Sequence, residues 1–121
     1  MANMDRDRRR ALKEQYKEIK IMMGVFQITN TQNGRIYIGS CPDLKNKWLT
    51  LKMQLDENKF ANAELQRDYR ELGPDAFAYE VLMEQETEEV VNMQKELKDI
   101  LLSWLEELEP YDARGYNKRL K

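Results

Sequence analysis

Residues 24–40 read GVFQITNTQNGRIYIGS and predict a β-hairpin. Two short runs rich in β-branched and aromatic residues, 24–30 and 35–40, flank the pair Asn33-Gly34. Asparagine and glycine tolerate the positive φ angles that tight hairpin turns need, so this pair between two such runs is a strong hairpin signal. Thr31 and Gln32 make the loop slightly longer than the tightest turn.

Apolar residues at helical spacing occur on both sides of this hairpin. Before it, Leu12, Tyr16 and Ile19 share one side of an amphipathic N-terminal helix that we expect within residues 1–21. After it, leucine stripes predict three more helices, and residues 77–83 alternate and then run apolar, which predicts a third strand. The three helices are expected to open at Pro42-Asp43 and include Leu44 to Leu55, to cover about 61–72, and to cover about 88–108.

This order of elements predicts an α+β fold, in which a small three-stranded antiparallel sheet, made of the hairpin plus one strand, is flanked by helices. The length of 121 residues fits one globular domain. We therefore expect a single domain over 22–121 with an added N-terminal helix over 1–21. The acidic cluster 84–89 is expected to be a solvated connector.

The composition excludes several classes of function. The chain has no histidine and one cysteine, Cys41, so it cannot build a Ser-His-Asp or Cys-His site or an internal disulfide. No apolar run approaches the roughly 20 residues that cross a bilayer, and no signal-peptide pattern is present, so we expect a cytoplasmic protein without a membrane partner. The net charge of −2 does not suggest a strongly basic nucleic-acid binder, although both ends of the chain are basic and the segment 84–109 is acidic.

Two triplets in the hairpin, Gly24-Val25-Phe26 and Tyr37-Ile38-Gly39, carry a family resemblance. The sequence resembles the GIY-YIG nuclease superfamily, in its homing-endonuclease-like branch, over about residues 22–117. The resemblance continues through residues typical of that branch, which are Ser40, Leu44, Lys47, Trp48, Leu65, Gln66, Arg67, Tyr69, Gly73, Phe77, Glu80, Val81, Leu82, Trp104, Gly115, Tyr116 and Asn117. It implies a GIY-YIG-like fold, with Gly24, Phe26, Tyr37, Gly39 and Asn117 as motif positions.

The resemblance also implies a chemistry, because active members look like metal-dependent phosphodiesterases that attack phosphorus with water. Such a site uses motif tyrosines, an arginine that neutralises the phosphate, often a histidine, and a glutamate that holds a divalent cation.

Most of those groups are substituted in this chain. The first tyrosine is Phe26, the arginine is Lys47 and the histidine position is Leu51, which is expected in the core. The metal glutamate falls on Leu101 or Leu102, depending on the register, and Asp99 and Glu96 are expected to face away from the site.

We therefore expect a nuclease-like domain with a silent site that acts as a nucleic-acid-binding module for DNA or RNA. Tyr37 and Lys47 are the remnant catalytic positions, and Arg35, Lys47, Lys52 and Arg67 are the candidate nucleic-acid-binding residues. We expect no metal ligands and no cofactor. Tyr37 is expected chiefly to pack between sheet and helix.

Two alternatives remain open. One is a protein-protein interaction domain that contacts a partner or a second copy through the N-terminal helix or the acidic late helix. The other is a divalent-metal-dependent DNA endonuclease with a rearranged site, in which Tyr37, Lys47 and either Glu80 or Asp99 act with Mg²⁺ or Mn²⁺.

Overall fold

The computed structural model describes residues 20–88 and 90–119. The expected N-terminal helix, with Leu12, Tyr16 and Ile19 on one side, lies outside the described residues except for Lys20 and Ile21, which are not helical. Among the residues described, no helix is long and apolar enough to cross a membrane.

The predicted hairpin is present as β1 (Met22–Asn30) and β2 (Ile36–Cys41). Gly34 has a φ of 78°, the left-handed conformation for which glycine is suited. The strand β3 (Phe77–Glu86) pairs antiparallel with the other side of β1, so the sheet order is β2-β1-β3. This arrangement confirms the predicted three-stranded antiparallel sheet.

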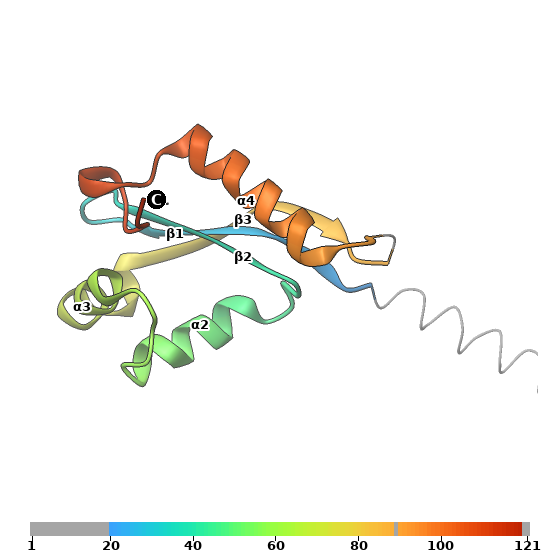
Figure 1. Ribbon diagram of the computed structural model, residues 1–121. Helices are drawn as coiled ribbons and strands as arrows, with labels where there is room; N and C mark the ends of the chain where they lie inside the picture. The colour runs from blue at the N-terminus through green and yellow to red at the C-terminus, as the bar shows by residue number, and fades with distance from the viewer. Residues whose placement is uncertain (1–19, 89, 120–121) are drawn as a thin grey trace, which may run out of the picture.

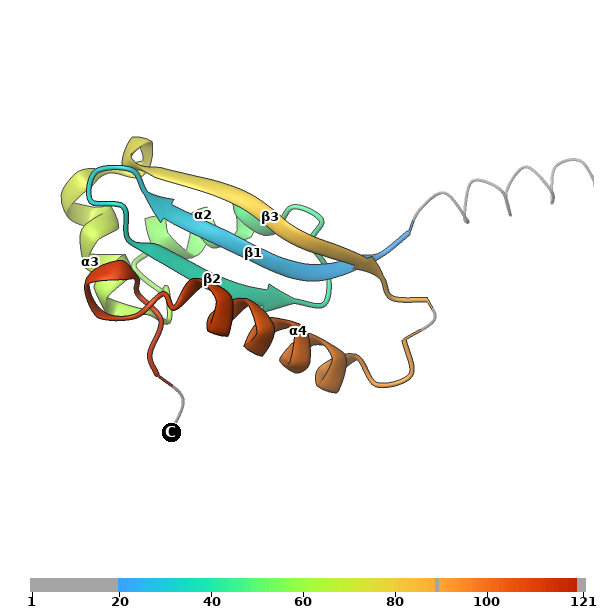
Figure 2. The same cartoon turned by 90° about the horizontal axis from the view of Figure 1, so that it is seen from above.

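Three helices cover the two faces of this sheet (Figure 1). The helices α2 (Lys47–Asp56) and α3 (Ala63–Leu72) lie below the sheet in the view of Figure 1, and α4 (Met93–Leu108) lies above it. Two short 3-10 turns, η1 (Pro74–Ala76) and η2 (Asp112–Arg114), follow α3 and α4. Seen from above, α4 runs along the β2 side of the sheet and not over β3 (Figure 2).

Each face of the sheet has its own apolar core, because alternate residues of a strand point to opposite faces. Phe26 and Ile28 pack with Leu51 and Leu55 of α2 and with residues of α3, which confirms Leu51 as a core residue. On the other face, Val25 and Ile38 pack with Leu105 of α4. The two faces therefore place neighbouring hairpin residues in different surroundings.

Two helices begin later than the sequence predicts. The first begins at Lys47 and not at Pro42-Asp43, because the Asp43 side chain accepts the Lys45 N–H at 3.0 Å and Asn46 adopts a φ of 56°. These local bonds make a turn in place of the first helical turn. The late helix begins at Met93 and not near 88, and the Asn92 side chain caps it by accepting the Lys95 N–H at 3.1 Å.

The acidic cluster is in part a strand and not a connector throughout. Glu84, Gln85 and Glu86 extend β3 beyond the expected end at residue 83 and pair with Gly24, Met23 and Met22. The register shifts opposite Val25/Phe26, where Leu82 forms a bulge, and this shift lets the strand continue along the start of β1.

Candidate functional site

At the two glycines of the motif triplets, Gly24 and Gly39, other parts of the protein pack closely against the backbone. Phe26 lies opposite Gly39 in the β1–β2 ladder, and a Cβ at position 39 would come within 2.5 Å of the Phe26 Cζ. A Cβ at position 24 would overlap the carbonyl oxygen of Met83 on β3. Both positions therefore need glycine for space, and Gly39 leaves room for the tip of the Phe26 ring beside β2.

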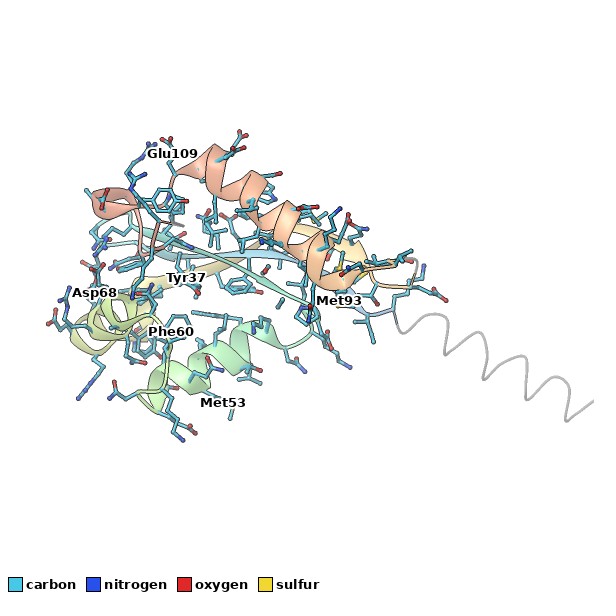
Figure 3. All side chains as sticks on the ribbon, viewed as in Figure 1. Tyr37, Met53, Phe60, Asp68, Met93 and Glu109 are labelled. Atoms are coloured by element: carbon cyan, nitrogen blue, oxygen red, sulfur yellow. The ribbon has the colours of Figure 1, made fainter. Side chains whose placement is uncertain are left out.

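Tyr37 is part of a row of aromatic rings on the α2–α3 face of the sheet. Its ring centroid lies 6.4 Å from that of Phe26 and 5.5 Å from that of Phe60, which it meets edge-on. The row continues from Phe26 to Tyr79 at 5.7 Å and on to Trp48 at 5.2 Å. Figure 3 shows Tyr37 and Phe60 close together between the sheet and the helices.

Burial raises the pKa of the Tyr37 phenol above its ordinary value near 10. The group is therefore protonated at neutral pH. At neutral pH Tyr37 therefore presents a hydrogen-bond donor.

Lys47 is the first residue of α2 and points its ammonium toward the aromatic row. Its Nζ lies 5.9 Å from the centroid of Phe26, the ring that also packs beside Tyr37. The structure thus brings Tyr37 and Lys47, the two catalytic positions predicted from the resemblance, together around Phe26. Lys52, one turn beyond Trp48 on the same helix, places its Nζ 5.4 Å from the Trp48 ring. The first turn of α2 contains no acidic residue.

Cys41 lies near this group and is buried. Burial raises the pKa of its thiol, although the positive charge of Lys47 and the N–H of Asp43 act in the opposite direction. The thiol is therefore protonated at neutral pH.

The two positions at which the resemblance predicts the metal glutamate contain aliphatic side chains in an apolar cluster. Leu101 and Leu102 pack against the core of Val25, Ile38 and Leu105 on the α4 face. A leucine has no ligand atom for a divalent cation, so neither residue fits that role. Among residues 20–88 and 90–119, no group of three or more Cys, Asp or Glu side chains is placed to hold a metal ion.

The carboxylates weighed for a rearranged site are not beside Tyr37. Asp99 is an exposed residue of α4. Glu80 pairs with Gln27, whereas its neighbour Tyr79 pairs with Ile28 and packs in the α2–α3 core. The alternation of a strand therefore directs Glu80 to the sheet face opposite the aromatic row.

Arg35, a candidate phosphate ligand, is held by protein groups from two other segments. Its guanidinium donates to Glu64 at 2.6 Å and to the Gly115 carbonyl at 3.0 Å, and it lies 4.2 Å above the ring of Tyr116. The side chain is 18% exposed. These contacts link the residue just before β2 to α3 and to the segment around Tyr116, so Arg35 has a structural role.

A buried polar network next to Arg35 was not predicted from the sequence. The Tyr116 hydroxyl donates to Asp68 at 2.7 Å and accepts from the Asn30 side chain at 3.0 Å. Burial and the Asp68 carboxylate raise the pKa of Tyr116. The network fixes the segment around Tyr116 against β1 and α3, and no local pattern could reveal it because its members lie far apart in the chain.

The other two candidates occupy different places. Asn117 bonds to the backbone of β2 through its side-chain amide and is therefore a structural motif residue. Arg67 is exposed on α3, with its Nε 3.7 Å from Asp68. It lines an open pocket of about 590 Å³ together with Arg70 and with Phe60, which the sequence did not single out as a ligand.

No protein-family model matches the chain. The intron-associated endonuclease 1 of Enterobacteria phage T4 is 29% identical to it over 98 residues, which are 78% of this chain and 36% of that protein. The chain thus spans about a third of the length of this relative.

Two solved structures of the catalytic domain of intron endonuclease I-TevI share the fold. One covers 80% of this chain and 98% of that domain, with a TM-score of 0.66 and 27% identity. The other, a Glu-to-Ala variant, has a TM-score of 0.67 at 27% identity and covers 80% of this chain and 93% of that one. The agreement of sequence and structure over the same domain means that this chain is homologous to the catalytic domain of I-TevI, a GIY-YIG homing endonuclease.

Proposed function

We propose that this nuclease-like domain binds nucleic acid without cleaving it. The observation that carries the proposal is the motif site itself, where Lys47 lies beside Phe26 and Tyr37 while Leu101 and Leu102 lie in an apolar core. The site keeps a cation and aromatic surface, which suit nucleic acid, and has replaced the groups that a phosphodiesterase needs.

The distribution of charge supports binding on the α2 side. Lys47 and Lys52 lie on α2, which has no acidic residue before Asp56 at its end, and Arg67 lies on the same side of the sheet on α3. The exposed acids of α4 lie across the sheet. Because α2 has two lysines against one acid and α4 has two lysines against four acids, a phosphate backbone would approach α2 more readily than α4.

Three substitutions support the absence of cleavage. Phe26 has no hydroxyl, and Lys47 presents a point charge in place of the two-pronged fork of arginine. The third is leucine in place of the carboxylate that would hold a divalent cation. The loss of one electrostatic group in a comparable site costs about 100- to 1000-fold in rate, so the combination would leave little activity.

The proposal is tested with supercoiled plasmid, with Mg²⁺ or Mn²⁺ present, scored in one experiment for nicking and for a gel shift. We expect a shift that weakens with salt and no nicking. Lys47→Ala is expected to weaken the shift, and Lys98→Ala, which removes an exposed lysine of α4, serves as the control of equal charge.

The other outcomes identify the two alternatives. Nicking that disappears in Tyr37→Phe would establish an endonuclease with a rearranged site. Neither nicking nor a shift would contradict the proposal and favour a protein-protein interaction domain.

A further inference from the structure

The open pocket of about 590 Å³ between the end of α2 and α3 is lined in part by Asn58, Phe60, Gln66, Arg67, Arg70 and Glu71. We propose that this pocket takes one unpaired nucleotide of a nucleic-acid strand, with the base against Phe60 and the phosphates on Arg67 and Arg70. This inference rests on the proposed function, because it assigns the form of nucleic acid that the α2–α3 side prefers.

The wall of the pocket is built in advance of any ligand. The buried Gln66 side chain accepts the Phe60 N–H at 3.0 Å and donates to the Leu55 carbonyl at 2.8 Å, so it ties the α2–α3 connection to α3. Phe60 is held on its other side by Tyr37, at 5.5 Å between centroids. Both amide atoms of Gln66 are engaged within the protein, so Gln66 supports the wall of the pocket and is not assigned to the ligand.

The two arginines supply anion recognition on one helix face. Arg67 and Arg70 are three residues apart on α3 and therefore neighbours on its surface. Both are exposed, and the one ion pair of Arg67 described here, Nε to Asp68, is long at 3.7 Å. Asp68 is engaged more closely by the Tyr116 hydroxyl at 2.7 Å. Guanidinium groups in this setting suit phosphate oxygens, which they bind in pairs.

The aromatic wall decides between single-stranded and duplex nucleic acid. A base in a duplex has both faces covered by its neighbours, so only an unpaired base can lay a face against a side chain. The volume of the pocket lies within the range of small-molecule sites, about 300–1,000 Å³. The apolar ring of Phe60 and the two neighbouring arginines together fit a nucleotide better than they fit an acidic peptide. Such a peptide would contact the arginines but not Phe60.

A substitution at Glu71 is expected to increase the affinity for nucleic acid, a result that a misfolded variant would not give. Its carboxylate lines the same pocket and would oppose a phosphate there. Glu71→Gln is therefore expected to strengthen binding about two- to threefold, through removal of one like charge near the ligand. A variant that loses its fold does not gain affinity.

The experiment measures fluorescence anisotropy of a labelled oligo-dT strand and of a labelled duplex, titrated with the full chain at two salt concentrations. We expect Arg70→Ala and Phe60→Leu each to weaken single-strand binding about tenfold and to change duplex binding much less. Arg114→Ala removes an arginine that pairs with Glu109, which Figure 3 shows across the sheet from Phe60, and is the charge-matched control.

The outcomes separate this inference from the proposed function. If Arg70→Ala and Arg114→Ala have equal affinity for the single strand, the pocket does not bind an unpaired nucleotide. If duplex binding still depends on Lys47 in that case, the proposed function stands. No binding of either nucleic acid by the parent protein would overturn both. Capture of an acidic peptide that competes with oligo-dT and is insensitive to Phe60→Leu would replace the nucleotide with a protein ligand.

Discussion

The side-chain amide of Asn117 forms two hydrogen bonds with the backbone of Ile38. Its Oδ1 accepts the Ile38 N–H and its Nδ2 donates to the Ile38 carbonyl, each at 2.8 Å. Two residues earlier, Gly115 pairs in parallel with Ile36 on the same strand edge. The segment Gly115-Tyr116-Asn117 thus covers the otherwise free edge of β2 beside Tyr37, as a short strand would.

Replacement of Asn117 should therefore destabilise the sheet edge. Asn117→Ala leaves both polar groups of Ile38 without their partner, at a cost of about 1–3 kcal/mol in the free energy of unfolding. The measurement is urea denaturation followed by circular dichroism. Asn33→Ala is the control, since the Asn33 side chain accepts an exposed N–H, that of Arg35, and should cost less. Equal losses in the two variants would contradict this role for Asn117.

A second prediction concerns the close approach of Phe26 to Gly39. Gly39→Ala should lower the free energy of unfolding by about 1–3 kcal/mol, because the new methyl group meets a buried ring that has little room to move. Adding Phe26→Leu should recover part of the loss, so the two substitutions should be less than additive. Strict additivity in the double-mutant cycle would show that the ring is not what limits position 39.

The third prediction separates two cations that the sequence presents alike. Arg35→Ala should lower the free energy of unfolding by about 1–3 kcal/mol, because it removes bonds to Glu64 and to the Gly115 carbonyl. Lys47→Ala should change stability much less and should instead lower the salt dependence of DNA binding by about one phosphate contact. Denaturation curves and a salt titration of both variants test this pair. A larger loss of stability in Lys47→Ala would reverse the assignment.

The hairpin could be predicted because its signals are local. The pair Asn33-Gly34 lies between two runs suited to strands, and Gly34 adopts the positive φ that the turn requires. The starts of α2 and α4 were less predictable, since the Asp43 side chain and the backbone of Asn46 replace a helical turn with a local one. Apolar spacing does not reveal that competition.

The sequence predicted which residues make up the candidate site but did not predict the long-range hydrogen bonds around it. The resemblance to GIY-YIG nucleases predicted Tyr37 and Lys47 as positions of one site, and in the structure both lie beside the ring of Phe26. The bonds of Asp68 and Asn30 to Tyr116 could not be foreseen, because they join α3, β1 and the end of the chain with no periodic pattern between them. The pocket wall at Phe60 depends in the same way on a tertiary bond from Gln66.

The last prediction is a loss of stability at alkaline pH that depends on Tyr69. This residue is 5% exposed, its hydroxyl donates to Asp56 at 2.6 Å, and burial with that carboxylate raises its pKa to about 12. A folded-state pKa above the unfolded value near 10 means that the stabilisation is fully present below pH 10 and is lost between about pH 10 and 12. By pH 11 the loss from this one group is about 1.4 kcal/mol.

Tyr69→Phe removes that ionisation and should flatten the fall in stability between pH 10 and 11, while it lowers stability at pH 7 by about 1 kcal/mol through loss of the bond to Asp56. Urea denaturation at pH 7, 10 and 11 measures both effects. Tyr111→Phe, which changes the tyrosine immediately before η2, is measured alongside as a second tyrosine-to-phenylalanine variant. Since burial also raises the pKa values of Tyr37, Tyr79 and Tyr116, some alkaline loss should persist in Tyr69→Phe. An unchanged slope in Tyr69→Phe would mean that the phenol at position 69 does not carry the raised pKa.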